Sequence, residues 1–278
     1  MSAETKIEMG VDGLGLNEGN AAVFRSLAEA AVRGTVVLDG TELHLADEPQ
    51  RRDGKVRVYQ EDCLSVCERL NKGRAEGQVA VLSFASGTSP GGMYRGDRGL
   101  RMKAQEESIC ARSGLWECLT AAGSRFYESN RALRGPEKAL QGSLLVYSPA
   151  VPAVVANESV IAIAMISAPA VHAASFRMQR RLAGGGEEET ERAIAQAMTA
   201  RIRAVFKTAA IHGHRVLVLG AFGCGVFANS PDTVASCFST VISELGHHFD
   251  ELAFSIVDPR PDTLQPFENL AIEFESRE

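Results

Sequence analysis

The alternation of short apolar runs with longer amphipathic segments is the feature that most constrains how this chain folds. Val79–Phe84 is an almost continuous apolar run, as expected of a strand that is buried on both faces. In residues 19–33, apolar side chains recur at helical spacing instead. Strands that alternate with helices build a layered domain around a parallel or mixed sheet. We therefore expect a layered α/β fold.

The same patterns place the other elements along the chain. Further strands are predicted at residues 36–38, 56–59, 144–147, 160–166, 216–219 and 252–257. Further helices are predicted at residues 62–70, 103–119, 188–211 and 231–245. Asp39-Gly40, between the strand at 36–38 and Leu43, is a short hairpin signal, and Asp62 is a candidate helix N-cap.

Length and composition are those of an ordinary globular chain. With 278 residues, 45% of them hydrophobic, the chain can bury a sizeable core. No stretch approaches the ~20 apolar residues that cross a bilayer, and the charged start lacks the apolar segment of a signal peptide. Six cysteines without a CxxC pair fit a reducing cytosol. We expect a flexible arm over residues 1–18, a single domain over residues 19–278, and a cytoplasmic protein without a membrane partner.

Two glycine-rich loops follow predicted buried strands, one at residues 83–93 and the other at residues 220–227. Ligands of open α/β sheets bind beyond the carboxyl ends of strands, and glycines let successive N–H groups approach an anion. The formal net charge of −6 argues against a wide polyanion contact, so such local donors would have to hold an anionic ligand. For either loop alone, a tight strand-to-helix turn explains the glycines equally well.

Two predicted helices begin with a run of acids. Gln105-Glu106-Glu107 follows the first glycine loop, whereas residues 184–189 (three glycines, then three glutamates) open a later helix with no buried strand before it. Acids in a first helical turn are favoured by the helix dipole. Composition alone therefore favours a solvated first turn for both runs. We interpret residues 184–189 as a flexible entry into a helix with solvated acids.

Six segments of the chain carry motifs that together point to one family. The signature part comprises Pro90-Gly91-Gly92, Ala104-Gln105-Glu106-Glu107-Ser108 and Arg112-Ser113-Gly114-Leu115-Trp116. The other three are Tyr147-Ser148-Pro149 with Val151-Pro152, Ile166-Ser167-Ala168-Pro169-Ala170, and the diphosphate loop Leu219-Gly220-Ala221-Phe222-Gly223-Cys224-Gly225-Val226-Phe227. Together they span roughly residues 20–260. In the same order, which chance rarely gives, they resemble the motifs of the microbial-type poly(ADP-ribose) glycohydrolases.

The resemblance implies a macrodomain-like three-layer α/β/α fold with a mixed central sheet and extra N-terminal helices. It also implies hydrolysis of the ribose–ribose O-glycosidic bond of poly(ADP-ribose), with ADP-ribose as the product. In this pattern Glu107 acts as general acid and base, and Glu106 orients the ribose. The residues expected to bind ADP-ribose are Ser83, Gly91, Gly92, Gln105, Gly223, Cys224, Gly225, Val226 and Phe227.

Two departures from the family pattern leave the substrate open. Met93 stands where the family has a third consecutive glycine, and the loop must rearrange if that position needs a positive φ. The spacer at 94–104 is also longer than in the family, and its cations are Arg95, Arg98, Arg101 and Lys103. A hydrolase that removes single ADP-ribose units from protein or nucleic acid is therefore an alternative. A non-catalytic ADP-ribose-binding macrodomain is another.

No cofactor and no metal are expected, because the histidines at 44, 172, 212, 214, 247 and 248 lack HExxH spacing. Cys224 lies in the predicted diphosphate loop, where the family makes no nucleophilic use of it. The basic run Arg177, Arg180 and Arg181 fits a solvated face or a place for a polyanion to lie. The expected partners are ADP-ribose, poly(ADP-ribose) and ADP-ribosylated macromolecules.

Overall fold

A computed structural model describes residues 11, 13–45, 52, 54–94 and 104–276 of the chain. Within these residues the strands form a seven-stranded sheet in the order β1-β4-β5-β3-β6-β7-β2. The strands are β1 Val36–Asp39, β2 Lys55–Tyr59, β3 Val79–Phe84, β4 Leu144–Val154, β5 Val160–Ala168, β6 Val216–Leu219 and β7 Glu251–Ser255. β5, β3, β6, β7 and β2 are mutually parallel, whereas β4 is antiparallel to both of its neighbours. The carboxyl ends of five strands therefore lie at one edge of the sheet.

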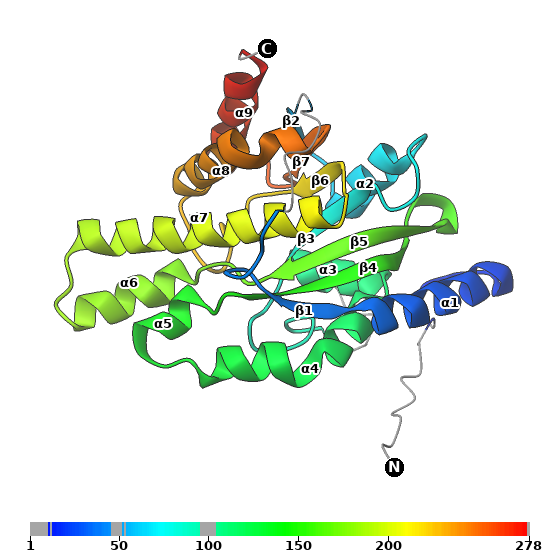
Figure 1. Cartoon of the computed structure of the whole chain (residues 1–278), viewed down its shortest axis with the longest axis horizontal. Coiled ribbons are helices and arrows are strands. Elements are labelled where there is room, and N and C mark those ends of the chain that lie inside the picture. Colours follow the sequence, from blue (N-terminus) through cyan, green and yellow to red (C-terminus); the bar gives the residue numbers. More distant parts are fainter. Residues whose placement is uncertain (1–10, 12, 46–51, 53, 95–103, 277–278) are drawn as a thin grey trace.

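Helices cover both faces of this sheet (Figure 1). They are α1 Glu18–Gly34, α2 Cys63–Asn71, α3 Gln105–Arg112, α4 Leu115–Ala132, α5 Gly135–Leu140, α6 Ala173–Leu182, α7 Glu187–Ile211, α8 Pro231–Leu245 and α9 Pro261–Glu275. Apolar side chains of α1 to α4 belong to the core on one face, and those of α5 to α9 to the core on the other. The expected three-layer α/β/α architecture with a mixed sheet is confirmed. An added N-terminal helix, α1, packs on β4 and β5.

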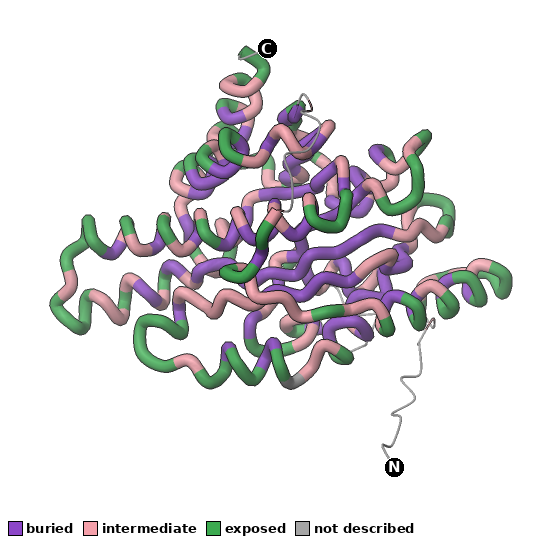
Figure 2. Tube along the Cα trace, viewed as in Figure 1, coloured by how far each residue is buried: buried purple, intermediate pink, exposed green. Residues whose placement is uncertain are grey.

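Local sequence explains where several elements begin. The Asp62 carboxylate accepts hydrogen bonds from the N–H groups of Leu64 and Ser65 and so caps α2, as predicted. Buried residues concentrate in the strands and on the inward faces of the helices (Figure 2), which is why β3 is apolar along almost its whole length. Of the predicted arm over residues 1–18, only residues 11 and 13–18 lie within the described part of the chain.

The prediction of a single helix over residues 103–119 is wrong, because α3 and α4 are separate helices. Ser113, between them, takes an extended conformation (φ −145°, ψ 176°) and forms an isolated bridge with Ala153 of β4. The Gly114 N–H group donates to the carbonyl oxygen of Pro152 at 2.9 Å. The chain therefore leaves the helical conformation where it contacts the edge of β4, a partner that helical periodicity does not reveal.

The hairpin predicted at Asp39-Gly40 is also wrong. β1 pairs with β4 instead, with Val36 opposite Tyr147, and Leu43 lies outside any strand. β4 is longer than predicted because a bulge between Ser148 and Val151 interrupts its pairing with β5, which then resumes. Helices α5, α6 and α9 have no counterpart among the predicted elements.

Candidate active site

Gln105 attaches the first turn of α3 to the end of β3. Its side-chain Oε1 accepts a hydrogen bond from the N–H group of Phe84 at 2.8 Å, and its Nε2 donates to the carbonyl oxygen of Leu82 at 2.8 Å. Pairing between β3 and β6 ends at Val81. The amide of Gln105 thus satisfies main-chain groups of β3 just beyond the last β6 pair. This contact fixes where the two following glutamates lie.

Glu106 is buried, with only 3% of its surface exposed. Its Oε2 accepts a hydrogen bond from the N–H group of Ser86 at 2.8 Å, and its Oε1 makes no hydrogen bond within the described residues. Burial raises the pKa of Glu106 well above the ordinary value, and the nearby charge of Glu107 adds to this, although the N–H groups of Ser86 and Gly91 oppose it. The fold therefore favours the protonated form of Glu106.

Glu107 is half-buried and lies against the glycine loop. Its Oε1 accepts a hydrogen bond from the Met93 N–H group at 3.1 Å. A Cβ atom added to Gly92 would lie 2.6 Å from Oε1 of Glu107 and 3.0 Å from Oε2 of Glu106. Gly92 also has a φ of +63°, in the left-handed region. Both the backbone conformation and the close approach of two carboxylates therefore require glycine at this position.

Met93 does not strain the loop. Gly91 and Gly92 have positive φ values of 67° and 63°, whereas Met93 is not among the residues with positive φ. Met93 is 80% exposed. The rearrangement that a methionine in the left-handed region would force is therefore not needed, because the position uses an ordinary backbone conformation.

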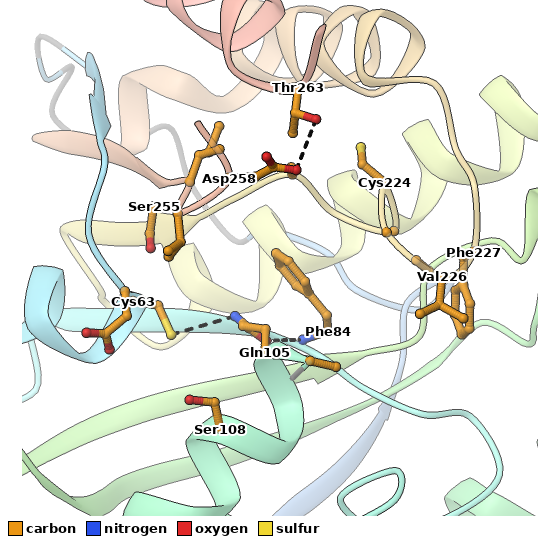
Figure 3. A pocket seen from close by; sticks show the side chains of 18 of the residues that line it. Cys63, Phe84, Gln105, Ser108, Cys224, Val226, Phe227, Ser255, Asp258 and Thr263 are labelled. Carbon is orange, nitrogen blue, oxygen red and sulfur yellow. Dashed lines mark hydrogen bonds between the residues drawn. The ribbon is translucent and has the colours of Figure 1, made fainter. Parts of the chain in front are cut away.

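A cavity of about 600 Å³ lies at the carboxyl edge of the sheet (Figure 3). Residues at or just after the ends of all five parallel strands contribute to its wall, as the rule for open α/β sheets leads one to expect. Of the residues predicted to bind ADP-ribose, those that line it are Gln105, Gly223, Cys224, Gly225, Val226 and Phe227.

The other predicted site residues lie beside this cavity and do not line it. Gln105, Ser108 and Arg112, on one face of α3, belong to the wall, whereas Glu106 and Glu107 project from other sides of the helix toward the loop with Gly91 and Gly92. Ser83 is completely buried in β3, and its Oγ makes no hydrogen bond within the described part of the chain. The structure thus gathers the predicted residues into two adjoining groups: the cavity wall and the carboxylate pair.

Sequence reasoning missed a polar part of the cavity wall. Arg112 and Asp62 form an ion pair at 2.6 Å, and both line the cavity. Hydrogen bonds from Ser65 and Arg112 hold the pKa of Asp62 below its ordinary value, although burial acts in the opposite direction. On another side of the wall, the Asp258 carboxylate accepts a hydrogen bond from the hydroxyl group of Thr263 at 3.3 Å. These segments follow β2 and β7, so their place after parallel strands was the available signal. They lack the glycines that marked the two predicted ligand-binding loops.

The two thiols in the wall, Cys63 and Cys224, are poor nucleophiles. Burial raises the pKa of each to about 12, which keeps both protonated near neutral pH. Cys63 accepts a weak hydrogen bond from Nε2 of Gln105 at 3.8 Å. Covalent chemistry at these sulfur atoms is therefore disfavoured.

The described residues contain no cluster of three or more potential metal ligands of the His, Cys, Asp and Glu types. Among the same residues, no helix is long and apolar enough to span a membrane. The basic segment with Arg95, Arg98, Arg101 and Lys103 lies outside the described residues.

Residues 3–155, more than half of the 278, match the family model for the catalytic domain of microbial-type poly(ADP-ribose) glycohydrolase (PARG). The structure is similar to that of PARG from Deinococcus radiodurans in complex with ADP-ribose, with 28% identity, a TM-score of 0.76, and coverage of 88% of this chain and 97% of that chain. PARG from Thermomonospora curvata is 31% identical, with a TM-score of 0.70 and coverage of 90% of this chain and 88% of that chain. The same enzyme bound to the inhibitor ADP-HPD gives a TM-score of 0.68 at 31% identity, over 91% of this chain and 88% of that chain. No curated protein sequence matches.

Proposed function

The chain belongs to the microbial-type poly(ADP-ribose) glycohydrolase family, as its six motifs predicted, and we propose that it hydrolyses the ribose–ribose O-glycosidic bond of poly(ADP-ribose) to release ADP-ribose. The observation that carries this proposal is the pair Glu106 and Glu107, held by main-chain N–H groups of the glycine loop beside the cavity. A solvated first helical turn would need no such donors. Two fixed carboxyl groups are what glycoside hydrolysis requires next to the scissile bond.

We assign the transferred proton to Glu107. A general acid must reach the departing oxygen, and Glu107 is half-buried, whereas Glu106 is 3% exposed. Oε2 of Glu107 is buried and makes no hydrogen bond within the described residues, so a rotation of the side chain that brings it to the leaving group breaks no hydrogen bond of this atom. Glu106, favoured in its protonated form by burial, can donate a hydrogen bond to a ribose hydroxyl and so orient the sugar.

The reaction then needs only groups of this chain and water. As the bond between the anomeric carbon and the bridging oxygen breaks, protonated Glu107 gives its proton to that oxygen, which leaves as a hydroxyl group. The ribose passes through an oxocarbenium-like transition state, which the nearby diphosphate charge of the ligand stabilises. Water attacks the anomeric carbon and loses a proton to the Glu107 carboxylate, which restores the acid.

We propose that ADP-ribose binds across the two groups of residues. Its diphosphate would contact the loop with Gly223, Cys224 and Gly225, and Phe227 would pack on the ribose side. Gly91 and Gly92 would face the ribose at the carboxylate pair. Gln105 and Ser83 remain predicted ligand contacts. The Gln105 amide already bonds to β3, which limits what it can offer a ligand.

The decisive assay offers the purified protein poly(ADP-ribose) and, separately, mono-ADP-ribosylated protein and nucleic acid, and measures free ADP-ribose by chromatography. We expect release from the polymer. Release from the mono-ADP-ribosylated targets alone would identify the alternative hydrolase. Binding of ADP-ribose without turnover of any substrate would identify a reader domain. The proposal would be refuted if the protein showed no binding and no turnover.

We further propose that the protein works in the cytoplasm as one domain over residues 19–278. The six cysteines are free thiols, which fits a reducing compartment. Helices from α1 to α9 pack on the same sheet. Cell fractionation tests the compartment. Limited proteolysis should leave residues 19–278 intact, and an early cut within this range would contradict the single domain.

A further inference from the structure

The loop at residues 223–229, which carries Phe227 into the cavity wall, has a backbone conformation that needs support. Ala228 has a φ of 54°, in the left-handed region that is unfavourable for a non-glycine residue. Within the loop, the Ala228 N–H group donates to the carbonyl oxygen of Gly225 at 3.0 Å, and Asn229 Nδ2 donates to that of Gly223 at 2.9 Å. These bonds close the loop on itself, and Asn229 Nδ2 also donates to the carbonyl oxygen of Val171 at 2.7 Å. None of them attaches the carbonyl oxygen of Ala228 to the rest of the fold.

That attachment comes from α6, through Arg177. Its Nη1 donates to the carbonyl oxygen of Ala228 at 2.7 Å. Its Nε and Nη2 donate to Oε1 and Oε2 of Glu191, in α7, at 2.6 and 2.7 Å. A bidentate pair of this kind fixes the plane of the guanidinium group. Glu191 therefore orients Arg177 so that its remaining donor meets the strained residue of the loop.

The residue before Ala228 is held by the same helix. The carbonyl oxygen of Phe227 accepts a hydrogen bond from the N–H group of Ala174 at 3.2 Å. The Phe227 ring stacks on that of His172, with centroids 4.6 Å apart and the planes at 20°. Two consecutive carbonyl oxygens of the loop and one aromatic ring are thus attached to the start of α6. α6 packs against α7 as a helical hairpin (Figure 1).

We propose that Arg177 and Glu191 are positioning residues for ADP-ribose, which hold the loop at residues 223–229 and its Phe227 ring in the binding conformation from outside the cavity. Neither residue lines the cavity. A loop that is already ordered does not have to be ordered when the ligand binds, so its support should appear in ligand affinity more than in the chemical step. The inference rests on the proposed function only in taking ADP-ribose as the ligand.

Arg177→Ala and Glu191→Gln test this inference. We expect the Kd for ADP-ribose, measured by calorimetry, and the KM for poly(ADP-ribose) to rise about tenfold, because the loop loses a charge-assisted hydrogen bond and must be ordered on binding. The kcat should stay within about twofold of wild type, since the carboxylate pair is untouched. In the free protein, the amide of Ala228 should exchange with deuterium faster than in wild type.

The neighbouring ion pair supplies the control. Arg180 and Glu189 join the same two helices at 2.6 Å, and within the described part of the chain Arg180 makes no hydrogen bond or ion pair with residues 223–229. Arg180→Ala should leave the Kd for ADP-ribose, the KM for poly(ADP-ribose) and the exchange of the Ala228 amide unchanged. Any loss in Tm should be small and similar in Arg180→Ala and Arg177→Ala. Equal losses of affinity in the two arginine variants would mean that Arg177 only stabilises the α6–α7 hairpin in general. That result would overturn the inference. Unchanged exchange of Ala228 in Arg177→Ala would also overturn it. Amide exchange is measured without substrate. It can therefore test the role of Arg177 even if the protein proves not to be a glycohydrolase.

Discussion

The first turns of α3 and α7 have nearly the same composition and opposite surroundings. Each begins after a glycine-rich stretch with neighbouring glutamates. Glu106 in α3 is 3% exposed and accepts a hydrogen bond from the main chain of a different loop. The Glu188 side chain in α7 is 91% exposed and forms an ion pair with Arg192, one turn along the same helix, at 2.8 Å. Exposed pairs of this kind stabilise a protein by only ~0–1 kcal/mol.

The difference comes from what precedes each helix. α3 follows β3 at the carboxyl edge of the sheet, where Gln105 attaches it to the strand and the loop with Gly92 folds over its acids. α7 begins at the tip of the hairpin that it forms with α6, away from the sheet (Figure 1). Burial therefore shifts the pKa of an acid in the first turn of a helix only where tertiary packing removes water from that acid. Four substitutions test this comparison.

The largest effect should follow Glu107→Gln. The variant keeps the size of the side chain and can still accept the hydrogen bond from Met93, but it cannot deliver a proton. We expect kcat on poly(ADP-ribose) to fall by ~10²–10⁴, and by more if Glu107 acts in both steps, with the Kd for ADP-ribose nearly unchanged. Turnover and calorimetry measure the two quantities. Wild-type turnover by a folded Glu107→Gln protein would remove Glu107 from the chemistry.

Gly92→Ala should come next. The new Cβ would lie 2.6 Å from Oε1 of Glu107, so either the loop or the carboxylate must shift. We expect roughly tenfold lower kcat or more, because small displacements of catalytic groups are costly. Gly184→Ala is the matched control. Gly184 also has a positive φ, of 75°, but its added Cβ would meet no atom within 4 Å. It should lose a similar amount of stability and no activity. Equal losses of activity in both variants would mean that backbone strain alone explains the result.

Glu106→Gln should change how stability depends on pH. Because the folded state raises the pKa of Glu106, the contribution of this group to stability is complete below its ordinary value near 4.5 and is lost as the pH rises through the raised value. Glutamine does not ionise, so the Tm of wild type should fall relative to that of the variant between pH 5 and pH 8. Each kcal/mol shifts Tm by ~2–4 °C at this size, which calorimetry resolves. Parallel Tm curves would show that Glu106 ionises freely. Weaker ribose orientation should also lower turnover, by less than in Glu107→Gln.

Glu188→Gln should have the smallest effect. It removes one exposed ion pair with Arg192 and touches neither cavity nor sheet. We expect kcat, KM and the Kd for ADP-ribose within experimental error of wild type, with Tm lower by no more than ~4 °C. A marked loss of activity would break the contrast between the two helix starts and point to a role of the α6–α7 hairpin in substrate binding.

The sequence by itself determined the fold class and most of the elements. Period-2 and period-3.6 patterns, the cap at Asp62 and the buried run of β3 are local properties, and the ordered motifs indicated the family. The same local rules could not predict where α3 ends, because the helix stops where Ser113 pairs with Ala153 of a distant strand. Nor could they see that the prediction of a hairpin after β1 was wrong, because β1 finds its partner in β4, far along the chain.

Only the tertiary structure decided which acids are buried and which residues share a wall. Both acidic runs open helices, and the structure shows that Glu106 is buried whereas the Glu188 side chain is exposed. Asp62 and Arg112 meet because β2 and β3 end at one edge of the sheet, and Arg177 reaches Ala228 although 51 positions separate them. Local pattern sets backbone conformation through interactions within a few residues. Solvent exclusion and ion pairing depend on segments that chain folding brings together from far apart, and one sequence window contains no record of them.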